Sequence, residues 1–223
     1  MINYSRKILA VLLHILIVAN ANSQQLFPFQ DEIINFKKQD SLNYPPKSAI
    51  LFAGSSSFRL WTDVQASFPG YTITNRGFGG STLIDVIHSV NDIIIPYHPK
   101  QIVLYCGEND LAASDSVTPR VVLQRFKQLF TLIRSAIPNI PLVYVSIKPS
   151  PSRQALMPKM EKSNKLIRKY LKMFQHTAFA DVYYKMLDQN GIPIKELFKE
   201  DNLHMNSQGY AIWQKVLKPY LLK

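Results

Sequence analysis

The chain has 223 residues, of which 26 are Lys or Arg and 15 are Asp or Glu, so its formal net charge is +11. This length suits one α/β domain, and an apolar share of 47% excludes global disorder. The single cysteine, Cys106, excludes an intrachain disulfide framework and a cysteine-rich zinc site. The basic charge raises the question of nucleic-acid binding, which the motifs along the chain have to answer.

The beginning of the chain has the pattern of a secretory signal peptide. Arg6 and Lys7 precede an apolar run over residues 8–18 that is interrupted only by His14, and small residues follow it. An uncleaved membrane anchor is the alternative, but a run of 11 residues is too short to span a bilayer core comfortably. The pattern therefore predicts a leader that is removed.

Cleavage after Ala21 or after Ser23 fits the small residues, and we favour Ser23. We expect residues 1–23 to be removed and residues 24–223 to form a single mature domain, secreted or periplasmic, with no stable membrane anchor. No Cys lies near the cleavage site, so a lipid anchor is not expected. Removal takes away two basic residues and no acidic one, which lowers the net charge to +9.

Short, continuously apolar runs that end at Gly, Pro or polar residues predict the strands of a buried parallel sheet. The expected strands are 49–53, 71–75, 102–106, 142–147 and, more weakly, 178–180. Residues 24–48, before the first strand, are interpreted as a polar segment in which Pro45 and Pro46 block a helix.

Helical patterns lie between these strands. Thr118 is expected to cap a helix with Pro119 at its first position, and apolar residues then recur at helical spacing until Pro138. Further helices are expected near 155–175 and over 207–218. Strands that alternate with helices predict an α/β fold with a parallel sheet of about five strands and helices on both faces.

Chemically useful residues follow the strands, at the carboxyl ends where α/β sheets bind ligands. They lie in Gly54–Ser57, Asn75–Ser81, Gly107–Asp110 and Asp201–His204. A hydroxyl group, a glycine-rich turn, an Asn and an Asp/His pair are the groups that acyl transfer requires. The other histidines lie in the leader, in a helical run or before a strand, so only His204 belongs to this rim.

These four segments resemble the sequence blocks of the SGNH hydrolases, also called GDSL esterases and lipases, and the resemblance extends over residues 49–218. It implies a three-layer α/β/α, flavodoxin-like fold and serine ester hydrolysis that needs no cofactor and no metal. Ser55 stands where the family has the Asp of its name. Three consecutive serines, Ser55 to Ser57, are therefore candidate nucleophiles, and the match to the motif favours Ser56.

By position in the family's blocks, Ser56 matches the nucleophile, and Asp201 and His204 match the acid and the base of the triad. The oxyanion hole corresponds to the backbone N–H groups of Ser56 and Gly80 and to the side-chain amide of Asn109. The chain contains no G-x-S-x-G elbow and no G-x-x-x-x-G-K-[ST] loop, which disfavours an ordinary α/β-hydrolase and a nucleotide-binding protein.

Four further charged residues on the same rim, Arg59, Arg76, Glu108 and Arg153, are candidate substrate contacts. The alternative is that they brace the loops through ion pairs and hydrogen bonds. Asp110 is expected to tie the loop after the third strand rather than to act as an acid.

The basic residues Lys162, Lys165, Lys169 and Lys172 fall on one stripe of a helix, which is expected to face solvent. No nucleic-acid motif accompanies them, so nucleic acid is not expected as a partner. The expected substrate is a small-molecule or glycan ester, with acetyl among the acyl groups. The competing hypothesis is a non-catalytic secreted protein that binds glycans or polyanions, and the complete set of candidate catalytic residues argues against it. The oligomeric state has no signal in the sequence.

Overall fold

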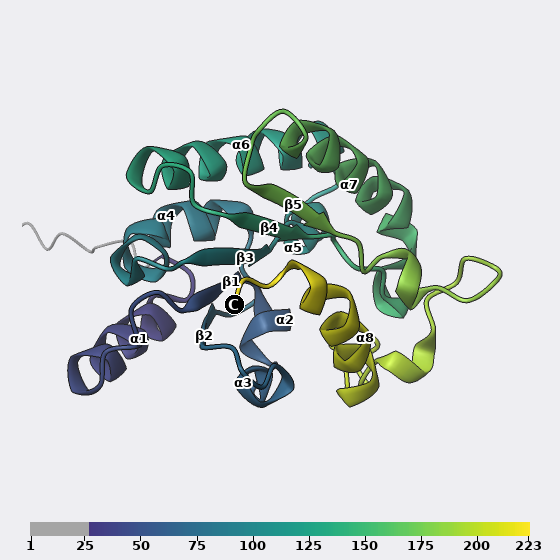
Figure 1. The fold of residues 1–223 in the computed structure, drawn as a ribbon. Coiled ribbons are helices and arrows are strands. Elements are labelled where there is room, and N and C mark those ends of the chain that lie inside the picture. The colour runs from purple at the N-terminus through teal and green to yellow at the C-terminus, as the bar shows by residue number, and fades with distance from the viewer. Residues whose placement is uncertain (1–26) are drawn as a thin grey trace, which may run out of the picture.

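The computed structural model describes residues 27–223, so the predicted leader, residues 1–23, lies outside the described part. A five-stranded parallel sheet in the order β2-β1-β3-β4-β5 forms the centre of the fold (Figure 1). The strands are β1 (Ile50–Gly54), β2 (Ile73–Gly77), β3 (Gln101–Tyr105), β4 (Leu142–Val145) and β5 (Thr177–Ala180). All five predicted strands are confirmed, with small shifts of their ends.

The strand order places β1 between β2 and β3, so the chain moves from β1 to one side of the sheet and then crosses to the other. In register, Gly54 at the end of β1 is level with Gly77 on β2 and Tyr105 on β3. The three carboxyl ends therefore meet where the order reverses, which is the usual place for a ligand site in an open parallel sheet.

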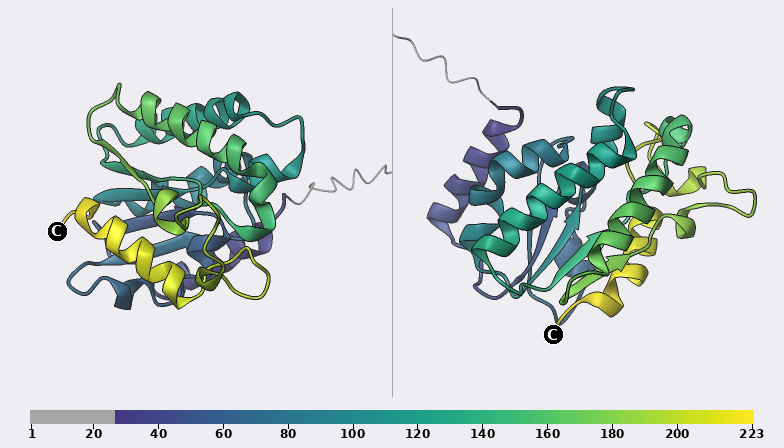
Figure 2. Two further views of the ribbon diagram at one scale, coloured as in Figure 1. Left: turned by 90° about the vertical axis from the view of Figure 1, so that its right-hand side faces the viewer. Right: turned by 90° about the horizontal axis from the view of Figure 1, so that it is seen from above.

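Helices cover both faces of the sheet and make a three-layer α/β/α fold (Figure 2). One face is covered by α1 (Gln30–Leu42), α4 (Leu83–Ile93), α6 (Pro119–Ala136) and α7 (Met157–Leu171). The other face is covered by α2 (Ser56–Arg59), α3 (Val64–Ser67) and α8 (Ser207–Leu217). The short helix α5 (Glu108–Ala113) follows β3 at its carboxyl end.

Two cores lie on the two faces because successive strand side chains point in opposite directions. On β1, Leu51 and Ala53 join the core under α4 and α6, whereas Ile50 and Phe52 join the core under α8. The second core is rich in aromatic rings, among them Trp61, which is 1% exposed and stacks on Tyr210. Trp61 is therefore a packing residue.

Helix α1 corrects the interpretation of residues 24–48 as a segment without a helix. Pro45 and Pro46 do lie outside helical structure, but they come only after α1 has ended at Leu42. Ile33 is the only buried residue of α1, so the helix has no broad apolar stripe for a sequence pattern to reveal. Contacts of Asp40 with Arg76 and of Glu32 with Gly79 hold the helix against the rest of the fold.

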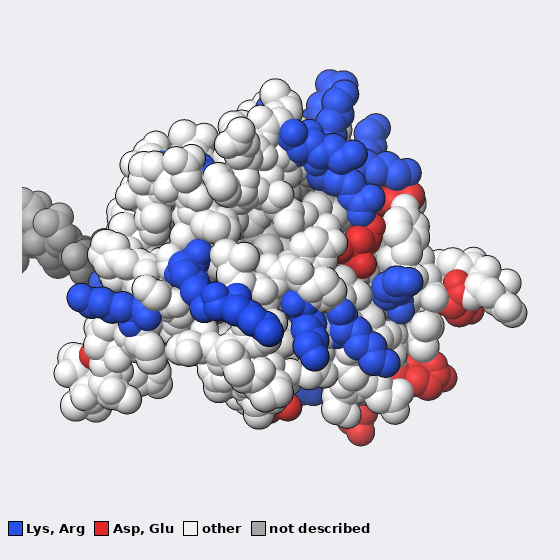
Figure 3. Space-filling model, viewed as in Figure 1, with Lys and Arg blue, Asp and Glu red and all other residues white. Residues whose placement is uncertain are grey.

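The later helices agree with the prediction. The Thr118 side chain accepts a hydrogen bond from the Val121 N–H, Pro119 begins α6, and the helix ends at Ala136. All four lysines of the predicted stripe are exposed, three on α7 and Lys172 directly after its end. Figure 3 shows Lys and Arg side chains gathered over this helix. Among residues 27–223, no helix is both long and apolar enough to cross a bilayer.

Candidate active site

Ser56 lies in the first turn of α2, directly after the carboxyl end of β1. Gly54 makes the turn with φ +133°, and a Cβ added there would lie 1.9 Å from the carbonyl oxygen of Tyr105. Glycine alone fits this close approach to the neighbouring strand. The tight turn places the Ser56 side chain at the reversal point of the sheet, where it is 9% exposed.

Ser56, His204 and Asp201 form a continuous chain of hydrogen bonds. The Oγ of Ser56 is 3.1 Å from Nε2 of His204, a residue 148 positions later in the sequence. Nδ1 of His204 is 2.6 Å from Oδ2 of Asp201. When Nδ1 donates to this carboxylate, Nε2 is left as the acceptor that can take the proton of Ser56. The structure thus brings together the three residues predicted as nucleophile, base and acid.

Asp201 is fixed by hydrogen bonds in addition to the one from the imidazole. Its Oδ1 accepts the backbone N–H groups of Leu203 and His204, each at 2.9 Å. Partial burial raises the pKa of this carboxyl group. The His204 side chain and the two N–H donors have the larger, opposite effect, and the resulting pKa is about 2. Asp201 is therefore ionised at neutral pH and can stabilise a positive charge on His204.

Gly80 and Asn109 lie next to each other, and Asn109 contacts Ser55, the residue before Ser56. Nδ2 of Asn109 donates to Oγ of Ser55 at 2.9 Å and to the carbonyl oxygen of Ser81 at 3.1 Å. Gly80 is exposed, and a Cβ added to it would lie 3.7 Å from that same Nδ2. Two of the predicted oxyanion residues, Gly80 and Asn109, thus lie side by side, and Ser55, which replaces the family's Asp, accepts a hydrogen bond from Asn109.

The loop that carries Asp201 and His204 is tied to the segment after β4. Nζ of Lys148 donates to the carbonyl oxygen of Leu203 at 2.8 Å. The backbone N–H of Ser152 donates to the carbonyl oxygen of Asn202 at 3.0 Å. Lys148 is only 1% exposed, although it is a lysine. Sequence reasoning missed its role. The available signal was its position directly after a buried strand, on the rim where the site was expected.

Glu108 neutralises the buried Lys148 and belongs to a network of four polar side chains. Its carboxylate accepts Nζ of Lys148 at 3.2 Å and the hydroxyl of Tyr105 at 2.5 Å, and Nη1 of Arg153 is 3.1 Å away. Burial lowers the pKa of Lys148, and the neighbouring carboxylate opposes that shift. These contacts are those of a brace between β3, β4 and the Asp201 loop.

The two other charged rim residues differ in environment. Arg76 is buried and donates to Asp40 on α1 and to the hydroxyl of Tyr97, so its contacts are also those of a brace. Arg59 is exposed at the end of α2, with its Nε 3.8 Å from the Glu32 carboxylate. Contact of Arg59, Arg76, Glu108 or Arg153 with substrate stays a prediction.

Asp110 ties two helices, as expected from the sequence. Its Oδ2 accepts the N–H of Leu83 at the start of α4, and its Oδ1 accepts Nη1 of Arg125 from α6, each at 2.8 Å. Cys106, just before α5, is fully buried, and burial raises the pKa of its thiol well above the ordinary value. Its thiol is therefore unreactive.

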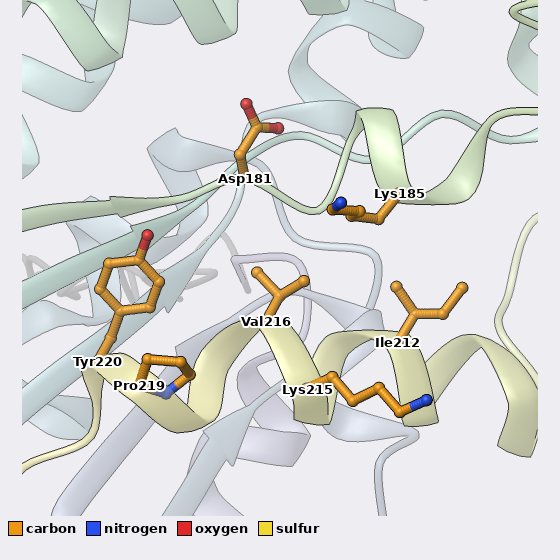
Figure 4. A pocket seen from close by; sticks show the side chains of 7 residues that line it. All are labelled: Asp181, Lys185, Ile212, Lys215, Val216, Pro219 and Tyr220. Carbon is orange, nitrogen blue, oxygen red and sulfur yellow. The ribbon is translucent and has the colours of Figure 1, made fainter.

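A hollow of about 570 Å³ lies between α8 and the segment that follows β5 (Figure 4). Ile212, Val216 and Lys215 on α8 line it from one side, and Asp181 and Lys185 line it from the other. It shares no residue with the site around Ser56. Within residues 27–223, no group of three His, Cys, Asp or Glu side chains is arranged to hold a metal ion.

Known structures have the same fold. A candidate platelet activating factor from Streptococcus pneumonia is 22% identical, with a TM-score of 0.76 over 89% of this chain and 95% of that one. A GDSL-like lipase from Bacteroides thetaiotaomicron is 18% identical, with a TM-score of 0.70 over 84% and 95%. An acetyl-xylooligosaccharide esterase from Geobacillus Stearmophilus is 13% identical, with a TM-score of 0.63 over 80% and 96%.

No curated protein sequence matches the chain significantly. A model of the GDSL-like Lipase/Acylhydrolase family, however, matches residues 44–212. This match begins just before β1 and ends within α8, so it includes every strand and all four segments of the site. The chain therefore belongs to the GDSL-like lipase/acylhydrolase family and is an ester-hydrolysing enzyme.

Proposed function

We propose that the enzyme cleaves acyl esters, acetyl esters among them, through an acyl intermediate on Ser56. The observation that carries this proposal is the hydrogen-bond chain from Oγ of Ser56 through His204 to Asp201, with distances of 3.1 and 2.6 Å. A serine hydroxyl is a weak nucleophile on its own, and an adjacent imidazole that an ionised carboxylate orients is the arrangement that activates it.

In the first half of the reaction, His204 takes the hydroxyl proton while Oγ of Ser56 attacks the ester carbonyl carbon. The tetrahedral intermediate collapses, the alcohol oxygen leaves, and His204 gives it the proton. In the second half, a water molecule attacks the acyl-Ser56 ester with His204 as the base. The acid leaves, and the proton returns to Oγ. Asp201 stays ionised throughout and stabilises the imidazolium.

The negative charge on the carbonyl oxygen would be held by the backbone N–H groups of Ser56 and Gly80 and by Nδ2 of Asn109. Nδ2 of Asn109 carries two hydrogens, which the Ser55 hydroxyl and the Ser81 carbonyl group accept in the free enzyme. The oxyanion would replace or share one of these acceptors, while the other bond keeps the amide in place. Donors that neighbouring groups already hold near the oxyanion need little reorganisation during the reaction, which helps them to stabilise the transition state.

Acetyl esters of carbohydrates are the first substrates to test, because one neighbour in structure is an acetyl-xylooligosaccharide esterase. A short-chain nitrophenyl ester is the general substrate beside it. We expect wild type to turn over at least one of the two and Ser56→Ala to lose turnover while its circular dichroism and melting temperature stay the same.

Ser57→Ala is the matched control, since it removes a hydroxyl one residue away from Ser56. It should keep most of the turnover. Comparable turnover in Ser56→Ala would refute Ser56 as the nucleophile. No wild-type turnover on nitrophenyl acetate, nitrophenyl butyrate or acetylated xylooligosaccharides would refute the proposed substrate class.

We also propose that residues 1–23 direct the chain out of the cytoplasm and are removed, on the basis of the sequence pattern alone. Expression of the full chain in a bacterium and mass spectrometry of the periplasmic and extracellular fractions test this. The expected product begins at Gln24. Recovery of the protein in the cytoplasm with Met1 still attached would contradict it.

A further inference from the structure

The turn that carries Gly80 is held from outside the part of the chain that matches the family model. Glu32, in the first turn of α1, accepts the backbone N–H of Gly79 with both carboxylate oxygens, each at 3.0 Å. The family model begins only at residue 44, after α1 has ended. A helix beyond the shared family segment thus contacts the residue directly before the proposed oxyanion donor.

A second contact from the same region presses on Gly79. A Cβ added to Gly79 would lie 2.0 Å from Cδ1 of the Phe29 ring, so the ring closes over this residue. Gly79 has φ +31°, and Phe29 itself has φ +66°, an unfavourable conformation for a residue other than glycine. Such a conformation persists only where neighbouring contacts hold it, and here it brings Phe29 and Glu32 against one glycine.

The far end of α1 is anchored independently. Asp40, in the last turns of the helix, accepts hydrogen bonds from Arg76 of β2 and from the hydroxyl of Tyr97. The side chains of Arg76 and Asp40 are 9% and 12% exposed. This buried ion pair fixes the helix against the sheet, so Glu32 reaches Gly79 from a rigid support rather than from a loose segment.

The contact bears on catalysis through the geometry of one peptide. The N–H of Gly80 belongs to the peptide group that Gly79 begins, and glycine has the widest choice of backbone conformations. When the Gly79 N–H is held by Glu32 and its Cα by Phe29, few orientations remain for the next peptide. An oxyanion donor depends on such orientation, since a hydrogen bond weakens steeply as its angle departs from linear.

We propose that Glu32 is a positioning residue that orients the Gly79–Gly80 peptide, so that the N–H of Gly80 points at the oxyanion. The inference rests on the proposed function, because it assigns Glu32 to the oxyanion hole of that reaction. Glu32 acts through Gly79 and does not contact the substrate. Arg59, whose Nε is 3.8 Å from the Glu32 carboxylate, balances the negative charge near the site.

The test compares four variants in steady-state kinetics on the ester that wild type cleaves. Glu32→Ala should lower kcat about tenfold, less than the 10²–10³ expected for loss of a whole donor, with KM within twofold of wild type. Glu32→Gln should keep most of kcat, because its amide oxygen still accepts the Gly79 N–H. Glu32→Asp keeps the charge but is one methylene shorter, and should lose kcat severalfold. Asp31→Ala, an exposed neighbour on α1, is the control and should behave as wild type.

Normal kcat in both Glu32→Ala and Glu32→Asp would overturn the proposal. A raised KM with unchanged kcat would also overturn it, since that result indicates contact with substrate. If Glu32→Ala does not fold, Glu32→Asp decides alone.

Amide hydrogen exchange separates failure of this inference from failure of the proposed function. Gly79 should exchange faster in Glu32→Ala, or in Glu32→Asp, than in Asp31→Ala, whether or not the protein is an esterase. Equal exchange would show that Glu32 does not hold the turn. Absence of wild-type turnover together with faster exchange would refute the esterase function and the catalytic role of Glu32. The contact of Glu32 with Gly79 would still be shown to stabilise the turn.

Discussion

Two sets of loops meet at Ser56, and different interactions hold them. One loop carries Asp201 and His204, and the other set carries Gly80 and Asn109. The first is tied by Lys148, a buried ammonium group that is paired with Glu108. In the second, the Asn109 side chain is held by hydrogen bonds to neutral groups, such as the Ser55 hydroxyl, while the carboxylates of Asp110 and Glu32 hold the surrounding backbone. Removal of one member of a buried ion pair strands a charge, whereas loss of a neutral hydrogen bond costs far less. Removal of Lys148 should therefore lower stability, and removal of the Asn109 side chain should mainly lower activity.

The largest effect is expected for Lys148→Met, which leaves the Glu108 carboxylate buried with Arg153 as its remaining charged partner. We expect the free energy of unfolding to fall by about 3–5 kcal/mol, measured by urea denaturation. The double variant Lys148→Met with Glu108→Gln should recover part of this loss, because the buried carboxylate is then replaced by a neutral amide. Equal stability of Lys148→Met and wild type would break the comparison.

Asn109→Ala tests the other side. Loss of the side-chain donor should lower kcat by about 10²–10³, or about 2.7–4 kcal/mol of transition-state stabilisation. The free energy of unfolding should change by only about 1 kcal/mol, since the bonds to Ser55 and to the Ser81 carbonyl group are between neutral groups. A loss of stability as large as that of Lys148→Met would show that the two sides do not differ.

Ser55→Ala probes the acceptor that orients Asn109 and should have a smaller effect. One neutral hydrogen bond is worth about 0.5–1.5 kcal/mol, so kcat should fall between a few-fold and about tenfold with KM unchanged. Steady-state kinetics on the same ester measures this. Loss as complete as that of Ser56→Ala would instead identify Ser55 as the attacking hydroxyl.

The smallest effect concerns acid pH. The pKa of Asp201 is lowered to about 2 in the fold, against about 3.9 in an unfolded chain. Its charge thus adds stability above about pH 4, and this contribution is lost as the pH falls through about 2. Since the side chain is 47% exposed, the contribution is under about 1 kcal/mol. Unfolding of wild type and Asp201→Asn between pH 2 and 6 should show a difference that vanishes toward pH 2. A difference that grows on acidification would contradict this sign.

The sheet was predictable because each strand is a short apolar run with a clear stop. Gly54 ends the first run and Gly107 follows the third, and β1 and β3 end beside them. Helix α1 was not predictable, because Ile33 alone is buried and the partner of Asp40, Arg76, comes 36 residues later. The local sequence pattern predicts which side chains of one element are buried, but it does not predict an ion pair between two elements.

The residues of the site were predictable from one rule, that the carboxyl ends of parallel strands share an edge. It grouped the segment Ser55–Ser57 with His204, and the match to the family motif selected Ser56, which lies 148 residues before His204. The supports of the site were harder to predict. Lys148 had only its position after a strand as a signal, and the contact of Glu32 with Gly79, 47 residues later, had none. A carboxylate that accepts a backbone N–H leaves no mark on the sequence near the donor.

The buried thiol of Cys106 has a practical consequence. Because it is the only cysteine in the chain and is fully buried, the folded enzyme offers no competing site for thiol-specific reagents. A cysteine introduced at an exposed position of α7, such as Lys169→Cys, would be the single reactive thiol. It would carry a fluorophore or a surface linker at one defined point, on a helix that contributes no residue to the site around Ser56, so single molecules could be immobilised in one orientation while they work.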